Sequence, residues 1–147
     1  MIPAFNEDGR LPPGIHDASW DEFVARFGHT EHRRGLIGGL AQALLSLRRA
    51  GCRVVYLDGS FVTDKDIPND YDGCWDVGGV DPSLLDPVLL QFDNWRAAQK
   101  AKFGGELFPA QGTEGGTGRV WLDFFQVDKD TGSAKGVVAI DLGSLPT

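Results

Sequence analysis

Two aspartates, Asp70 and Asp72, flank a single tyrosine in the sequence LDGSFVTDKDIPNDYDG at 57–73. If Tyr71 lies in a strand and points into the core, both carboxylates point out of the other face, about 6.6 Å apart along the strand. Two like charges at that spacing repel each other. A divalent cation reverses this effect, because Mg²⁺ takes one or two carboxylates together with substrate phosphates. The pair therefore predicts a site for Mg²⁺ or Mn²⁺.

A third acid, Asp123, stands in the apolar segment VWLDFFQ. An unpaired charge inside a buried strand is costly, so an acid there needs a partner. We expect a strand to carry Asp123 to the other two aspartates, which would complete a site for two metal ions about 3.5–4 Å apart. Three further aspartates are weaker candidates because they stand in turns or at strand ends, where Asp is ordinary: Asp128, Asp130 and Asp141.

The pair Gly59-Ser60 ends an apolar run shortly before the two aspartates. Glycine lets a phosphate approach the backbone closely, and the amide and hydroxyl of the next residue can donate hydrogen bonds to it. Lys65 follows in the loop and adds a positive charge suited to a triphosphate. We therefore expect Gly59, Ser60 and Lys65 to bind the phosphates of a nucleotide beside the metal.

The helices and strands that must position these groups are predicted from the periodicity of apolar residues and from the glycines and prolines that end regular structure. Length indicates a single domain over 1–147, with an irregular lead-in at 1–18 that packs on the core. Helices are expected at 19–28 and 30–50, a mainly helical segment at 81–104, a hairpin turn at 128–132, and strands at 53–57, 71–77, 106–110, 119–127 and 136–142. This order predicts an α+β fold with a mixed β-sheet flanked by helices.

The first two helices carry clear start signals. Ser19 with Glu22 three residues later matches a capping box, and Thr30 is expected to cap the longer helix. Within 30–50, apolar residues recur at helical spacing and predict one buried stripe: Leu36, Ile37, Leu40, Ala43, Leu44 and Leu47.

The order of these parts resembles the polymerase-β-like nucleotidyltransferase superfamily. Its signature is a helix, a strand ending in Gly-Ser, a spacer, Asp-x-Asp on the next strand, and a third acid on a later strand. The corresponding parts here are helix 30–50, strand 53–57, Gly59-Ser60, Asp70 with Asp72, and Asp123. The segments LPPGIH and AGCRVVYLDGSFVTDKDIPNDYDGCWD also resemble small bacterial nucleotidyltransferase-like proteins, which are often associated with toxin–antitoxin or defence loci.

The resemblance implies a minimal nucleotidyltransferase fold and the transfer of NMP from an NTP to a hydroxyl group. Asp70, Asp72 and Asp123 would then be the catalytic metal ligands. An RNA such as a tRNA end, or a partner protein, is implied as the acceptor, and the chain would act as a toxin with a cognate antitoxin. The alternative is a catalytically inactive module of the same fold that binds a partner protein, for example as an antitoxin.

Charge and composition limit the partners and the compartment. Net charge is −7, from 21 acids and 14 bases, which argues against indiscriminate nucleic-acid binding. No apolar run is long enough to cross a bilayer and no signal peptide is visible, so we expect a cytoplasmic protein with no membrane partner. Six arginines in one third of the chain indicate either a solvated helix face or a phosphate-facing surface: Arg26, Arg33, Arg34, Arg48, Arg49 and Arg53.

Overall fold

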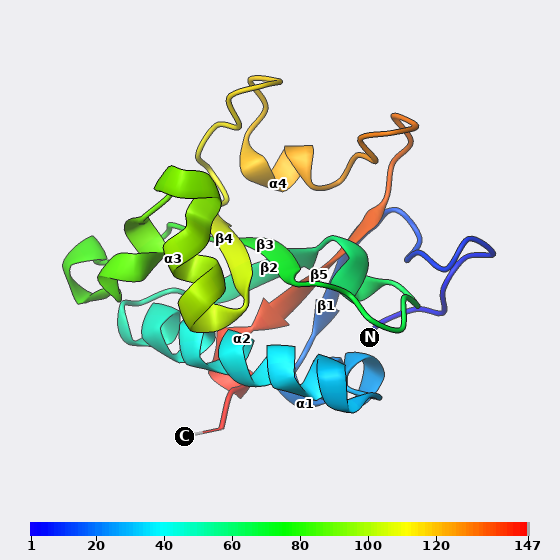
Figure 1. Ribbon diagram of the computed structural model, residues 1–147, viewed down its shortest axis with the longest axis horizontal. Helices are drawn as coiled ribbons and strands as arrows, with labels where there is room; N and C mark the ends of the chain where they lie inside the picture. The colour runs from blue at the N-terminus through cyan, green and yellow to red at the C-terminus, as the bar shows by residue number, and fades with distance from the viewer. Residues whose placement is uncertain (147) are drawn as a thin grey trace.

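The computed structural model describes residues 1–146 and contains one five-stranded mixed sheet (Figure 1). β1 runs parallel to β5, β3 runs parallel to β4, and β2 is antiparallel to both of its neighbours. In spatial order the strands are β1 (Gly14–Ala18), β5 (Gly136–Asp141), β2 (Val54–Asp58), β3 (Tyr71–Trp75) and β4 (Gly105–Pro109). The expected α+β class with a mixed sheet flanked by helices is confirmed.

Helices cover both faces of this sheet. α1 and α2 lie on one face and the short α4 lies over the other, while α3 packs beside β4 (Figure 1). The helices are α1 (Trp20–Phe27), α2 (Glu31–Arg49), α3 (Asp93–Phe103) and α4 (Trp121–Phe124), with 3-10 turns η1 (Ser60–Val62), η2 (Pro82–Leu84), η3 (Pro87–Leu90) and η4 (Leu142–Ser144). Within residues 1–146, no helix combines the length and the apolar character needed to cross a membrane.

The predicted caps of α1 and α2 are both present. The Ser19 hydroxyl accepts a hydrogen bond from the Glu22 amide at 3.2 Å, and the Thr30 hydroxyl accepts one from the Arg33 amide at 3.1 Å. The Glu22 carboxylate does not close the capping box, because it accepts instead from the amide of Ile2. The N-terminal segment is thereby tied to α1.

Two stretches differ from the expected elements. The end of the lead-in forms β1, since Pro12 and Pro13 stop regular structure only before Gly14, and the residues after them pair with β5. Residues 119–127 do not form a strand; they contain α4. The aromatic residues Trp121, Phe124 and Phe125 recur at intervals of three and four, which is helical spacing.

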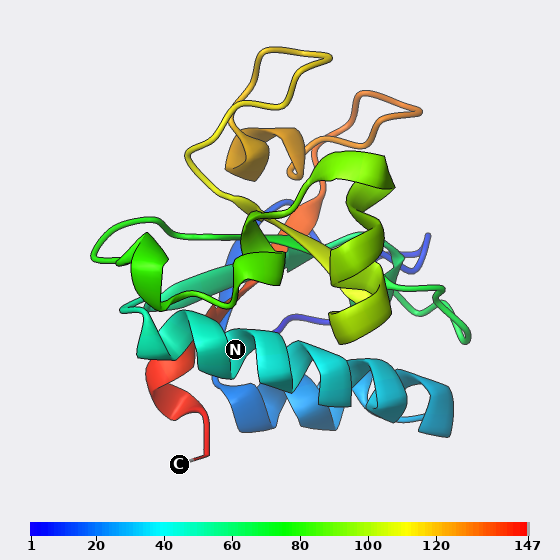
Figure 2. The same ribbon diagram turned by 60° about the vertical axis from the view of Figure 1, so that its left-hand side comes forward.

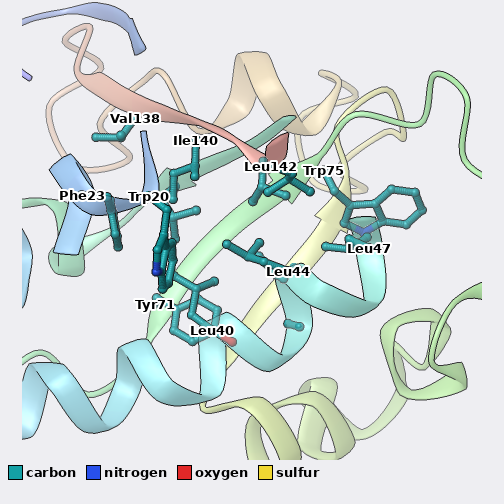
Figure 3. Packing of buried hydrophobic residues seen from close by; sticks show 14 of the residues in the cluster. Trp20, Phe23, Leu40, Leu44, Leu47, Tyr71, Trp75, Val138, Ile140 and Leu142 are labelled. Carbon is teal, nitrogen blue, oxygen red and sulfur yellow. The ribbon is translucent and has the colours of Figure 1, made fainter. Parts of the chain in front are cut away.

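The main core lies between the sheet and the pair α1 and α2 (Figure 3). The α2 stripe is confirmed, with Leu40, Leu44 and Leu47 fully buried, and Tyr71 and Trp75 of β3 meet it from the sheet. A smaller apolar cluster lies on the opposite face, under α4: Cys74, Phe108, Ala110, Phe125 and Val137. Because alternate residues of a strand face opposite sides, the two clusters show which strand positions belong to which face.

A buried arginine joins α2 to the loop after β2. Arg33 is fully buried and donates five hydrogen bonds of 2.6–3.3 Å to main-chain oxygens of Phe27, Phe61, Thr63 and Lys65. Its guanidinium also lies 4.8 Å from the centre of the Phe61 ring. Arg33 is therefore neither part of a solvated face nor part of a phosphate-facing surface: it fixes the loop that follows Gly59-Ser60.

Replacing Arg33 tests this role. We expect Arg33→Leu to lower the free energy of unfolding by about 3 kcal/mol, because four main-chain carbonyl oxygens lose their donor and the bonds to Phe27 and Phe61 are buried. The matched control is Arg34→Leu, since Arg34 is exposed and donates only to Gly28, and its cost should stay below about 1 kcal/mol. Urea unfolding followed by circular dichroism measures both, and equal losses in the two variants would contradict the assigned role.

Candidate functional site

Three carboxylates lie side by side on neighbouring strands. Asp58 of β2 is paired in register with Asp72 of β3, and Asp72 is paired with Glu106 of β4. The next pairs along the same face, Tyr56 with Cys74 and Cys74 with Phe108, are covered by the α4 cluster. The carboxylate row Asp58–Asp72–Glu106 therefore lies on the α4 side of the sheet, away from the main core.

Asp70 comes directly before β3, two residues ahead of Asp72, and it lies outside the lining of the cavity described below. Burial, followed by the charge of Glu106, raises the pKa of the Asp70 carboxyl above its usual value. Lys100 and Lys65 act in the opposite direction. The predicted pair is thus present, and it meets a third acid that the sequence analysis did not single out.

Asp72, at the centre of the row, has the most perturbed carboxyl of the site. Burial and then the charges of Asp70, Glu106 and Asp58 raise its pKa to about 7, and a hydrogen bond with the Glu106 carboxyl adds to the effect. Such a bond requires a proton on one of the two carboxyls. Burial and the neighbouring acids thus disfavour the charged form of Asp72, an effect that a bound cation would reverse.

The two outer acids of the row have cationic partners. Glu106 pairs with Arg96 at 3.1 Å and with Lys100 at 2.9 Å, and Asp58 pairs with Lys135 at 3.3 Å. Asp70 and Asp72 form no ion pair with any residue in 1–146. Across the same described range, no three acidic, histidine or cysteine side chains are grouped closely enough to hold a metal ion as they stand. Glu106 would have to exchange its cations for a metal.

Arg96 reaches Glu106 from an unusual backbone. Asn94, Trp95 and Arg96 all have positive φ angles of 50–58°, which breaks α3 near its start. Left-handed conformation costs a non-glycine residue roughly 1–2 kcal/mol, so the surrounding contacts must hold it. Two guanidinium nitrogens of Arg96 donate to the same Glu106 oxygen, at 3.2 and 3.1 Å.

A cavity of about 720 Å³ opens over the carboxylate row. Gly59, Ser60 and Lys65 line it together with Asp72 and Glu106. Gly59 has φ 81°, and a Cβ atom built there would come 2.7 Å from a carboxylate oxygen of Asp72. A side chain at this position would therefore collide with the acid, so the glycine is what lets the loop pass beside it. The volume is within the range of small-molecule sites.

The prediction that Asp123 belongs to a strand and joins the pair is not supported by its position. Asp123 lies on α4, its side chain is exposed, and it is absent from the cavity lining. It also makes no contribution to the raised pKa of Asp70 or Asp72. The apolar neighbours that suggested a buried strand are buried by one side of a helical turn, which leaves Asp123 free to face solvent.

Asp58 and Glu106 are the site residues that the sequence analysis missed. Glu106 is the only charged residue in the short strand GELFP, and Asp58 ends the apolar strand VVYLD. An acid inside or at the end of an apolar strand was the signal used for Asp123, and it applies equally to these two. What the sequence does not give is the register that brings them to Asp72.

No arginine of α2 lines this cavity. α2 packs on the sheet face opposite to the carboxylate row and α4 (Figure 2). Arg34 donates to Gly28, and Arg48 donates to Leu145 and Pro146. The cations that do line the cavity come from other elements: Arg10, Lys65, Arg96, Lys129 and Lys135.

The raised pKa of Asp72 predicts a pH-dependent stability. The folded chain holds the Asp72 proton more tightly than the unfolded chain, so this group lowers stability as pH rises from about 4 to about 7. Asp72→Asn stays neutral, and its stability relative to wild type should increase on the order of 2 kcal/mol between pH 5 and pH 8. Urea unfolding at both pH values measures this. Asp123→Asn, an exposed acid on α4, should show no such change, and a pH-independent difference for Asp72→Asn would refute the coupling.

Comparisons with known proteins give one match. The model of the DUF6932 family, described as a family of unknown function, matches residues 3–141. No curated protein and no solved structure matches the chain. Because the family match spans nearly the whole sequence, the chain belongs to the DUF6932 family.

Proposed function

We propose that the chain is a metal-dependent nucleotidyltransferase that moves NMP from an NTP to a hydroxyl group of an RNA or a protein. The observation that carries this proposal is the carboxylate row beside Gly59-Ser60 in one cavity that also contains several cations. Carboxylates suit a divalent cation, and a glycine-serine backbone with nearby lysine suits phosphates. The cavity thus brings Asp72 and Glu106, as carboxylates that suit a cation, together with Gly59, Ser60 and Lys65, as groups that suit phosphates, and this supports the proposal.

Asp70, Asp72 and Glu106 are the side chains that would hold Mg²⁺ or Mn²⁺, with Glu106 in the role first expected of Asp123. The bound cation would supply positive charge against the triphosphate. Gly59 and Ser60 would hold the β- and γ-phosphates, with Lys65 neutralising part of their charge. The donor set fits a hard cation because it consists of carboxylate oxygens.

The transfer itself balances without a further reactant. The acceptor oxygen forms a bond to the α-phosphorus, the bond between that phosphorus and the bridging oxygen breaks, and pyrophosphate leaves. The proton of the acceptor hydroxyl passes to solvent water, because Asp70, Asp72 and Glu106 would be occupied by the cation.

The position of the α2 arginines limits how an acceptor molecule could be bound. Because the α2 arginines lie on the far face, the acceptor must be held by the cavity rim or by a partner molecule. A tRNA end and a protein hydroxyl both fit this description, as does a role as the toxin of a toxin–antitoxin or defence pair in the cytoplasm. The alternative, an inactive binding module, is favoured by the ion pairs that already neutralise Glu106.

A labelling assay tests the transfer. The purified protein is incubated with each α-³²P-labelled NTP, Mg²⁺ or Mn²⁺ and a cell extract, and RNA and protein are then separated on gels. We expect label on one class of acceptor, and a loss of at least about a hundredfold in Asp72→Asn and in Glu106→Gln, because each removes a proposed metal ligand.

Asp123→Asn is the matched control, since it removes an acid outside the cavity lining, and its activity should equal that of wild type. Full activity in Glu106→Gln together with loss in Asp123→Asn would return the third-acid role to Asp123. Label on neither RNA nor protein with all four nucleotides would favour the inactive module.

Metal binding has a readout of its own. At pH 8, millimolar Mg²⁺ should raise the melting temperature of wild type, because a ligand that binds only the folded state stabilises it. The increase should be absent in Asp72→Asn and retained in Asp123→Asn, measured by differential scanning fluorimetry. An equal increase in all three proteins would show that the cation acts elsewhere.

A further inference from the structure

We propose that Phe124 of α4 is the stacking platform for the nucleobase of the bound nucleotide. This inference rests on the proposed function, since it assigns the part of the cavity that the phosphate and metal groups leave unused. The ligand of the aromatic wall would be a planar heterocycle joined to phosphates, rather than a free phosphate or an apolar molecule.

One side of the cavity is lined by aromatic rings, which come from β4 and from α4 with the residue that follows it: Phe108, Trp121, Phe124 and Phe125. Phe108 is buried between two roughly parallel rings, those of Trp121 at 3.8 Å and Phe92 at 5.9 Å. Phe125 is also buried. Phe108 and Phe125 are thus enclosed within the wall, and both faces of Phe108 are covered by other rings.

Phe124 differs from the rest of the wall in the orientation of its ring. Trp121 is also half-buried, but one of its faces stacks on Phe108, whereas Phe124 meets Trp121 at 79° and Phe125 at 68°. Among the described residues 1–146, no ring lies parallel to it. A half-exposed ring that lines a cavity and has no parallel neighbour can accept a base, which stacks on any π face.

The wall lies directly beside the carboxylate row. Phe108 follows Glu106 by two residues on β4, so it is the next side chain on the same face, about 6.6 Å further along the strand. α4 covers that position. A single ligand can therefore have its phosphates at Gly59-Ser60 and its base at the α4 wall.

The polar lining of the cavity supports the same ligand. Lys129 and Asp130 line it from the turn after α4, beside the aromatic wall in sequence. Both side chains are exposed, and the edge of a base offers an acceptor to Lys129 and a donor to Asp130. An anion without a base would leave the aromatic wall uncovered.

Calorimetry with ligands that bind but do not react tests the platform. The probes are the four α,β-methylene nucleoside triphosphates and inorganic tripolyphosphate, each with Mg²⁺. For wild type we expect the best nucleotide analogue to bind about tenfold or more tightly than tripolyphosphate, because of the stacked base. Phe124→Leu should lose about this tenfold advantage and leave the Kd of tripolyphosphate within twofold.

Two further variants control for folding and for non-specific stacking. Phe124→Tyr keeps a ring and should bind the analogue as wild type does. Trp95→Leu removes an aromatic side chain that is 77% exposed and outside the cavity lining, and should change neither Kd. Equal affinity of wild type for the analogue and tripolyphosphate, or an unchanged Kd in Phe124→Leu, would overturn the inference.

The outcome separates this inference from the function on which it rests. Phe124-dependent binding without transfer of label from any nucleotide would retain the base site and overturn the transferase. Label transfer by Phe124→Leu with the KM for NTP of wild type would retain the transferase and overturn the base site.

Discussion

The buried guanidinium of Arg33 connects the two parts of the molecule on which the candidate site depends. It lies on α2, within the main core, and its hydrogen bonds end on the backbone of the loop that follows Gly59-Ser60. Burial lowers the pKa of Arg33, and the charges of Asp66 and Asp64 oppose this effect. The direct hydrogen-bond partners of the guanidinium are main-chain oxygens. Since a phosphate would be held by that loop, packing on one face of the sheet sets the geometry on the other.

The same division of the sheet determines where the acids lie. Leu57, Tyr71 and Leu107 point into the main core, so their neighbours Asp58, Asp72 and Glu106 must point to the other side. A slip of one residue in any of these strands would bring a carboxylate into the core and an apolar residue out of it. The hydrophobic set therefore fixes the register, and the register fixes the carboxylate row. Gln99 of α3 adds to this by accepting from the amide of Leu107 at the outer edge of β4.

Local signals predicted the local features well. The cap at Thr30 and the periodicity of 36–47 gave α2, and alternation gave the outward direction of Asp72. Features that depend on distant pairing were not predictable in this way, because the position of Glu106 beside Asp72 follows from the pairing of β3 with β4. The strand expected around Asp123 was wrong for a different reason: the apolar neighbours of Asp123 have spacings that a strand and a helical turn can both bury, and only the tertiary contacts decide between the two.

Within the carboxylate row, basic side chains form ion pairs with the two outer acids but not with Asp72. Glu106 and Asp58 have cations beside them, whereas Asp72 is surrounded mainly by other acids. A binding module gains nothing from an uncompensated buried acid, while a site for a cation requires one. On the proposed function, a triphosphate would also offer Arg96 a second anion in place of Glu106. Nucleotide binding would then free Glu106 for the metal, so the two ligands would bind with positive coupling.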